Sequence, residues 1–166
     1  MNNKINIKEL AQLAVICAVM FISKEVAAYI PNVHPVMLII ISTTLCFRWK
    51  AMFPVVAFSL LEIFIYGLGL WTIMYLYIWP IAVIIVMAFR KVKSYWMWAL
   101  ISGLYGLCFG ALCSIPYIFI NGLKGAFEYW LVGIPYDLIH GASNFVITAL
   151  LLPVLLPIMQ KLKARI

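Results

Sequence analysis

The stretch LWTIMYLYIWPIAVIIVMAF, residues 70–89, carries no charged side chain, and Arg90, Lys91 and Lys93 follow it closely. An α-helix needs about 20 apolar residues to cross the hydrocarbon core of a bilayer. Basic residues that follow such a stretch mark the cytoplasmic end of a membrane-spanning helix. Residues 70–89 therefore predict one complete span that ends at the cytoplasmic face.

Similar basic clusters divide the rest of the chain, and between successive clusters there is enough apolar sequence to cross a bilayer and return. The four clusters are Lys4 with Lys8, Arg48 with Lys50, Arg90 with Lys91 and Lys93, and Lys161 with Lys163 and Arg165. The opposite connections, 31–34 and 67–71, carry no Lys or Arg, and 121–130 carries only Lys124. By the positive-inside rule the four clusters, and with them both termini, are expected to be cytoplasmic.

The overall composition excludes an ordinary soluble domain. Hydrophobic residues make up 67% of the 166 residues and charged residues 10%, whereas soluble domains carry roughly 25% charged residues. The net charge of +7 is dispersed over membrane-flanking loops. It therefore indicates topology and attraction to lipid headgroups rather than nucleic-acid binding. This length fits a single domain, residues 1–166.

Charged residues, proline and glycine divide the chain into six apolar segments. The segments are Ile7–Tyr29, Val33–Phe47, Ala51–Tyr66, Leu70–Phe89, Tyr95–Ile120 and Leu131–Met159. We expect an all-α fold, an integral membrane bundle of six transmembrane helices. The second and third segments are shorter than a full span and begin near Pro35 and Pro54. They are expected either to thin the bilayer or to be partly re-entrant.

Small residues recur every four positions in the fifth segment, on one face of the predicted helix. This stripe consists of Ser102, Gly106, Gly110 and Ser114. Small residues allow a neighbouring helix backbone to approach closely, and we expect the stripe to pack within the bundle. In the first segment, Ala14 and Ala18 form an AxxxA pair with Ala11 one turn earlier. That second stripe could equally face another subunit.

Ionisable residues inside a membrane are costly, and they usually pair with one another or line a cavity. Those near the outer ends of the segments are Lys24, Glu25, Glu62 and Asp137. Each lies about 6 to 8 Å below its predicted outer boundary, at 1.5 Å per residue, so the four share one depth. Lys24 is expected to snorkel or to pair with Glu25 or Asp137. His140 and Asn144 follow Asp137 at i+3 and i+7, which makes one helix face polar.

The outer half of the predicted bundle is also rich in aromatic residues. Trp and Tyr gather at any membrane interface, which explains part of this enrichment. It does not explain buried charges and a polar helix face at the same depth. A pocket that stacks a ring and forms hydrogen bonds with its edges explains both. The expected ligand-binding residues are Glu62, Trp71, Tyr75, Trp79, Tyr136, Asp137, His140 and Asn144.

The sequence lacks the motifs of common catalytic and nucleotide-binding sites. Neither HxxxH nor HExxH occurs, so no metal site is expected. No P-loop occurs either, so the chain has no ATPase of its own; neither enzymatic activity nor a cofactor is expected. A secondary carrier usually shows inverted repeats and broken helices, which are not evident here. An ion-coupled secondary transporter, a membrane-embedded enzyme and a structural subunit remain as alternatives.

Along its whole length the chain resembles a known family. The resemblance rests on the six segments, the AxxxA stretch, and the runs YGLGLWTIMYLYIWP (66–80) and YWLVGIPYDLIHGASNFVITALLLPVL (129–155). The family is the substrate-binding membrane subunit, or S component, of energy-coupling factor (ECF) type vitamin importers. The resemblance implies a multi-pass protein of the bacterial plasma membrane that binds a vitamin from outside. It also implies docking onto a coupling transmembrane subunit and two ATPase subunits.

The same resemblance implies two further roles. Ala14 and Ala18, with Ala11, would contact the coupling subunit. The loop PNVHP, residues 31–35, would act as a gate, with Asn32 and His34 as gating residues. Nickel and cobalt members of the family begin with a Met and His extension, whereas this chain begins MNNKIN. That difference argues against a metal ion as the ligand.

The charge balance of the outer layer gives a preference among vitamins. Acidic groups outnumber basic groups there, so a ligand rich in hydrogen-bond donors, or partly cationic, is easier to accommodate than a dicarboxylate such as folate. Cobalamin, with its many amides, is the expected ligand. Thiamin or its pyrimidine precursor, pyridoxine and riboflavin are the other candidates.

Overall fold

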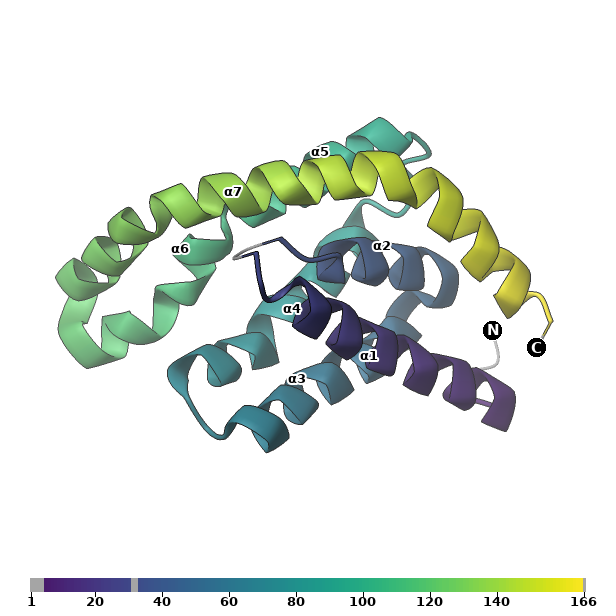
Figure 1. Ribbon diagram of the computed structural model, residues 1–166, viewed down its shortest axis with the longest axis horizontal. Helices are drawn as coiled ribbons and strands as arrows, with labels where there is room; N and C mark the ends of the chain where they lie inside the picture. Colours follow the sequence, from purple (N-terminus) through teal and green to yellow (C-terminus); the bar gives the residue numbers. More distant parts are fainter. Residues whose placement is uncertain (1–4, 31–32, 166) are drawn as a thin grey trace.

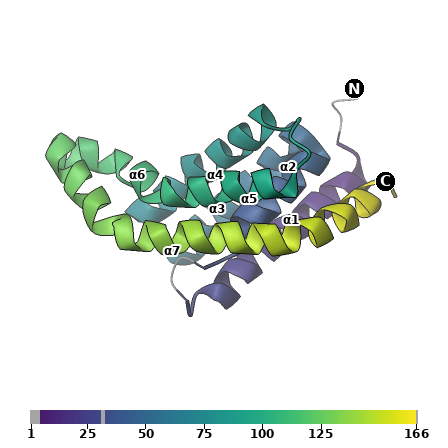
Figure 2. The ribbon, with the colours of Figure 1, turned by 90° about the horizontal axis from the view of Figure 1, so that it is seen from above.

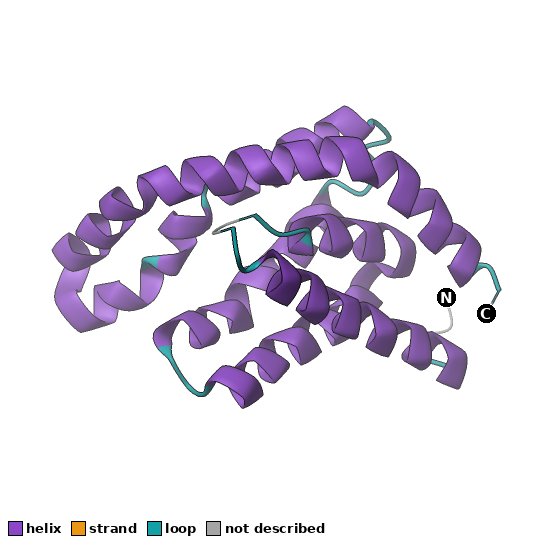
Figure 3. Cartoon of the chain, viewed as in Figure 1, coloured by secondary structure: helices purple, strands orange, loops and turns teal. Residues whose placement is uncertain are grey.

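The computed structural model describes residues 5–30 and 33–165, and every regular element within these ranges is a helix. Figure 3 shows the helices joined by short loops. The helices are α1 Ile7–Ala27, α2 Val36–Phe47, the 3-10 helix η1 Arg48–Ala51, α3 Met52–Tyr66, α4 Leu70–Ala88, α5 Tyr95–Leu107, α6 Phe109–Cys113 and α7 Ile115–Lys163. The predicted all-α fold is confirmed.

Four helical stretches of the described chain are long and apolar enough to cross a membrane. They are residues 7–27, 36–66, 70–88 and 115–163. The stretch 36–66 comprises α2, η1 and α3, and the stretch 115–163 is α7. These lengths and compositions are compatible with an integral membrane protein.

α2 lies at the centre of the bundle. Eleven of its twelve residues are buried, and it contacts α1, α4 and α7. A helix that is apolar on every side is stable only where other apolar surfaces surround it. Nine of the twelve residues of VMLIIISTTLCF are apolar, which favours a place in the core for α2.

The second and third predicted segments form two separate short helices. α2 begins at Val36 after Pro35 and ends at Phe47, before Arg48, whose φ of 56° lies in the left-handed region. That conformation is unfavourable for any residue with a Cβ and interrupts the helix. Figure 1 shows α2 and α3 running in different directions. Their 12 and 15 residues extend for about 18 and 22 Å, less than the roughly 30 Å of a bilayer core.

The segment from Asn121 to Trp130 differs from the prediction, because it is helical rather than a connecting loop. α7 runs through it and departs from helical geometry at Gly122, with φ 71° and ψ −178°. Glycine adopts a positive φ without steric cost. After it, the pair Lys124–Glu128, 3.8 Å apart at i,i+4, favours helix. In Figure 1 the chain reverses direction here, so α6 and the first turns of α7 lie opposite the following turns.

Ser102 and Gly106 of α5 and Gly110 of α6 pack against α7, so packing within the bundle is confirmed for these three residues of the predicted small-residue stripe. α5 lies alongside α7 in both ribbon views (Figures 1 and 2). A Cβ added to Gly106 would lie 2.8 Å from the backbone nitrogen of Gly141, so the close approach of the two backbones requires glycine. One turn earlier, Thr148 Oγ1 donates a hydrogen bond of 2.8 Å to Ser102 Oγ.

The beginning of α1 and the end of α7 lie at the same end of the molecule (Figure 1). Gln12 Nε2 donates a hydrogen bond of 3.0 Å to the carbonyl oxygen of Leu162. Lys50 Nζ lies 2.6 Å from Glu9 Oε2, and Lys163 Nζ donates to the carbonyl of Cys46. The chain segments next to three of the four predicted basic clusters are thus brought together.

Candidate functional site

α4 presents three aromatic residues on one face, because Trp71, Tyr75 and Trp79 are spaced by four residues. The ring centroids of Trp71 and Tyr75 are 5.5 Å apart, and those of Tyr75 and Trp79 are 5.3 Å apart. Both pairs are edge-on, the arrangement that aromatic quadrupoles favour. Trp71 is 42% exposed and Trp79 is 1% exposed. The three rings therefore lead from the surface to the interior.

Trp79 and His140 are linked in the interior by the rings of His34 and Phe109. The centroid of His34 lies 6.0 Å from Trp79 and 5.1 Å from His140. The centroid of Phe109 lies 5.5 Å from Trp79 and 4.6 Å from His140. We call these four residues the ring cluster. They come from the loop before α2, from α4, from the start of α6 and from α7, so the fold alone brings them together.

Several polar atoms of the ring cluster are buried and have no hydrogen-bond partner in the described part of the chain. They are Trp79 Nε1, His34 Nδ1 and both ring nitrogens of His140. Buried polar atoms are almost always paired, with protein groups or with water. An indole N–H only donates, whereas a neutral imidazole both donates and accepts. The cluster is therefore suited to a molecule that carries donors and acceptors at its edge.

Lys24 joins two carboxylates near Trp71, at the exposed end of the aromatic face of α4. Its Nζ lies 2.7 Å from Glu62 Oε2 and 3.0 Å from Glu25 Oε1, and 5.1 Å from the ring centroid of Trp71. The predicted pairing with Glu25 is confirmed, whereas the second carboxylate is Glu62 and not Asp137. Glu62 is fully buried, and its Oε1 has no partner among the described residues.

Asp137 lines a pocket of 620 Å³ between α6, the first turns of α7 and the middle of α7. Its Oδ1 accepts a hydrogen bond of 2.8 Å from the backbone N–H of Gly110. Its Oδ2 is buried without a hydrogen-bond partner in residues 5–30 and 33–165. The carboxylate thus has one oxygen fixed by the protein and one available as an acceptor.

Aromatic residues form much of the wall of this 620 Å³ pocket. Tyr117 and Tyr129 stack with their centroids 4.1 Å apart, and Tyr136, a predicted ligand residue, lines the pocket while remaining 56% exposed. Phe109 lines the pocket as well and also contacts His140. The pocket and the ring cluster are therefore adjacent and share the ring of Phe109.

His34 is held in its neutral form by its surroundings. Burial, together with the positive charge of Lys24, lowers its pKa from 6.5 to about 4. A neutral imidazole offers one donor and one acceptor nitrogen. His34 can therefore act as a hydrogen-bonding group at physiological pH without adding a charge to the site.

The remaining predicted residues either make other contacts or are exposed, and one lies outside the described chain. Asn144 is buried, and its Nδ2 donates a hydrogen bond of 3.4 Å to the carbonyl of Ser102, so α5 supplies a partner for its amide. The predicted gating residue Asn32 lies outside the described residues. Ala11, Ala14 and Ala18 are all exposed on α1, which leaves this stripe accessible to lipid or to another protein.

Two residues of the site were not predicted to belong to it. Phe109 has no neighbouring charge or spacing that would mark it; it enters the site because the chain breaks between α5 and α6. Gly110 was predicted only as a packing residue, although its N–H binds Asp137. Gly110 continues the stripe that packs on α7, so the register of that stripe against Asp137 was the available signal.

No cluster of three or more His, Cys, Asp or Glu side chains that could hold a metal ion occurs among the described residues. No model of a known protein family matches the sequence, and neither a characterised protein nor a solved structure matches it.

Proposed function

We propose that this chain is the high-affinity substrate-binding membrane subunit of an ECF-type importer, which captures a vitamin or related micronutrient for ATP-driven uptake. The observation that carries the proposal is the ring cluster, where buried polar atoms without protein partners lie next to a pocket of 620 Å³. Ligand sites combine apolar and aromatic walls with a few polar groups that fix orientation. Both features are present here.

The proposed topology has six spans with both termini in the cytoplasm of a bacterial cell. The spans are α1, α2, α3, α4, α5 with α6 and the first turns of α7, and the remainder of α7. The gathering of Lys50, Lys163 and the start of α1 at one end of the molecule supports a common cytoplasmic face. The ring cluster then belongs to the outer half of the bundle.

The proposed ligand is ring-bearing and rich in hydrogen-bond donors. Glu62 Oε1 and Asp137 Oδ2 are acceptors without partners among the described residues, and the rings of Tyr129 and Tyr136, which line the 620 Å³ pocket, offer surfaces for stacking. Cobalamin is the first candidate because of its many amides. Thiamin or its pyrimidine precursor, pyridoxine and riboflavin are the others.

The proposed partners are a coupling transmembrane subunit and two ATPase subunits. The chain has no P-loop, so energy for uptake against a gradient must come from elsewhere. The exposed stripe of Ala11, Ala14 and Ala18 supports a helix contact with the coupling subunit, because small residues allow close backbone approach.

Isothermal titration calorimetry on the detergent-solubilised chain, without partners, tests the binding function against this panel of vitamins. We expect one of them to bind with a Kd below about 1 μM, or about −8.2 kcal/mol. Trp79→Phe keeps a ring but removes the indole N–H, and should weaken binding about 10-fold. Trp96→Phe is the matched control, since Trp96 is 69% exposed. If no vitamin binds, or if both variants bind like the wild type, the ring cluster is not the site.

A further inference from the structure

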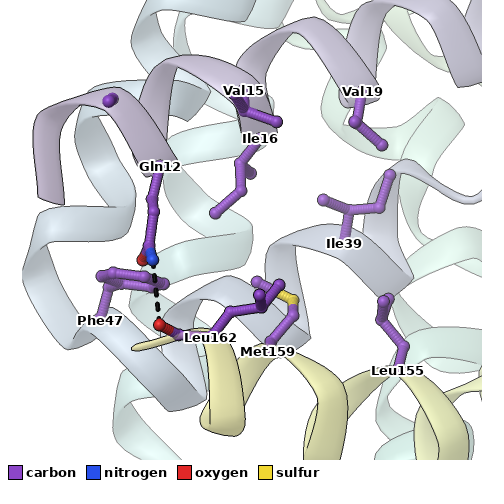
Figure 4. Close-up of a pocket in the computed structure, with 10 residues that line it drawn as sticks. Gln12, Val15, Ile16, Val19, Ile39, Phe47, Leu155, Met159 and Leu162 are labelled. Carbon is purple, nitrogen blue, oxygen red and sulfur yellow. Dashed lines mark hydrogen bonds between the residues drawn. The ribbon is translucent and has the colours of Figure 1, made fainter. Parts of the chain in front are cut away.

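A groove of 460 Å³ lies between α1 and the last turns of α7, with side chains of α2 between them (Figure 4). Val15 and Val19 of α1 face Leu155 and Met159 of α7 across this groove. Apart from Gln12, the side chains that line it are apolar. From residue 11 to residue 19 the groove follows α1 for about 12 Å. That is close to half of a hydrocarbon core of about 30 Å, the depth of one leaflet.

Gln12 lies at one end of the groove, and only the nitrogen of its amide has a hydrogen-bond partner among the described residues. Its Nε2 donates to the carbonyl oxygen of Leu162, which ties α1 to α7. Its Oε1 is buried and has no hydrogen-bond partner in the described part of the chain. An unpaired buried acceptor beside an otherwise apolar groove is suited to a hydroxyl or amine donor on a largely apolar molecule.

Basic side chains follow at this same end of the groove. Lys8 precedes Gln12 by four residues on α1 and therefore lies on the same helix face. Arg165 follows Leu162 by three residues, and its N–H donates to the carbonyl of Leu162. Lys8 and Arg165 are both exposed. The nearby carboxylate of Glu9 is already paired with Lys50, so the rim of the groove favours an anion.

We infer that this groove binds one acyl chain of an anionic glycerophospholipid with a hydroxyl-bearing headgroup, such as phosphatidylglycerol. The acyl chain lies between Val15 and Met159. The phosphate lies near Lys8 and Arg165, and a headgroup hydroxyl donates to Gln12 Oε1. A helix of another protein would fill the apolar groove but would not account for the basic rim. The inference depends on the membrane setting and not on the proposed import function.

Native mass spectrometry of the full chain, released from micelles that hold equal amounts of phosphatidylglycerol and phosphatidylcholine with the same acyl chains, tests this inference. We expect one phosphatidylglycerol per chain to be retained in preference. Lys8→Gln with Arg165→Gln should lower that retention about 30-fold, the loss expected for two cationic contacts with an anionic lipid. Arg90→Gln with Lys91→Gln, which removes two exposed charges of another cluster, should leave retention unchanged.

A second pair of variants tests the apolar part of the groove. Val15→Phe fills the groove from an exposed position of α1 and should abolish retention of the lipid. Val56→Phe adds the same ring at an exposed position of α3 and should have no effect. Equal retention of the two lipids by the wild type would overturn the inference. So would equal retention by the two phenylalanine variants, or a second copy of the chain found in place of the lipid.

Discussion

At Asp137 a structural role can be tested separately from a role in ligand binding, because its two carboxylate oxygens differ in their partners. Oδ1 is fixed by the N–H of Gly110, and Oδ2 has no partner among the described residues. Asp137→Asn keeps an acceptor for Gly110 and removes the charge. Loss of a hydrogen bond to a charged group, roughly 1.5–3 kcal/mol, should weaken vitamin binding about 10- to 100-fold. Calorimetry measures this Kd, and an unchanged Kd would remove Asp137 from the binding site.

Asn144→Ala is the matched comparison at the same polar face of α7. Its amide donates to the carbonyl of Ser102, so the variant should lower the melting temperature of the ligand-free protein. Removal of a buried hydrogen bond costs about 1–3 kcal/mol. Asp137→Asn should leave that temperature nearly unchanged. A reduced affinity in Asn144→Ala with an unchanged melting temperature would show that Asn144 contacts the ligand directly.

His34 makes the stability of the folded protein depend on pH, and the sign of this dependence follows from its pKa of about 4 in the folded protein. The unfolded chain has a His pKa near 6.5 and so binds more protons between these values. The contribution of neutral His34 to the stability of the folded protein is therefore fully present above about pH 6.5 and is lost as the pH falls towards 4. His34→Gln should therefore show a smaller fall in melting temperature between pH 7 and pH 4.5 than the wild type. Equal falls in the two proteins would contradict this account.

Residue identity alone predicted part of the site. Trp79 and His140 were both predicted as ligand-binding residues, and the structure brings them into one cluster. Phe109 could not be predicted, because its place depends on where α5 breaks and how α6 turns towards α7. The partner of Lys24 was likewise a matter of tertiary structure, since Glu62 lies 38 positions away.

At the level of elements, the contact of α5 with α7 depends on glycine at position 106. Gly106→Ala places a Cβ 2.8 Å from backbone atoms of Gly141, and forced overpacking of this kind costs about 1–3 kcal/mol. The melting temperature of the ligand-free protein should fall by about 2–12 °C, at 2–4 °C per kcal/mol for a chain of this size.

Gly133→Ala is the control for that change, because nothing lies within 4 Å of a Cβ added at Gly133 in α7. Alanine has the higher helix propensity, by about 1 kcal/mol. This variant should melt at the wild-type temperature or slightly above it. Equal melting temperatures for the two variants would mean that α5 and α7 can separate without loss, contrary to the packing described here.

The exposed face of α1 predicts where uptake depends on another protein. Ala14→Leu and Ala18→Leu enlarge an exposed surface without disturbing the core, so vitamin affinity should stay within about 2-fold of the wild type. Cellular uptake should be abolished if this face contacts the coupling subunit. Ala57→Leu, at an exposed position of α3, should leave uptake intact. Full uptake by the purified chain in liposomes under a proton gradient would instead establish a secondary transporter.

The helices could be predicted to different degrees. α1 and α4 have nearly the predicted bounds. α4 is a charge-free run that basic residues follow, and α1 is a long apolar run that ends shortly before Pro31. The helix over 123–130 was missed because Gly122 and the polar residues Asn121 and Lys124 are typical of a loop. A single glycine with positive φ is enough to reverse the chain, and the residues after it then continue as helix. The prediction of a loop over 121–130 relied on polarity alone and was therefore wrong for most of this segment.

In the whole molecule, the charge pattern and the packing agree on one end. The segments next to the first, second and fourth basic clusters meet through Glu9 with Lys50, through Gln12 with Leu162, and through Lys163 with Cys46. Nothing in a linear charge pattern requires such contacts. Their occurrence at one end of the bundle supports the proposal that these clusters face the same side of the membrane.

That proposal predicts which positions react with a membrane-impermeant thiol reagent in intact cells. In a background with the four native cysteines replaced by alanine, Trp49→Cys between α2 and α3 and Lys91→Cys after α4 should label only after the cells are opened. Lys124→Cys, at a site where the side chain is 89% exposed beside Gly122, should label from outside. In the six-span topology, four crossings separate position 124 from the outer end of α1, and two separate it from the outer end of α3. An even number of crossings returns the chain to the same side, so position 124 lies outside. Labelling of Trp49→Cys in intact cells would mean that α2 and α3 do not each cross the membrane, and the six-span topology would have to be abandoned.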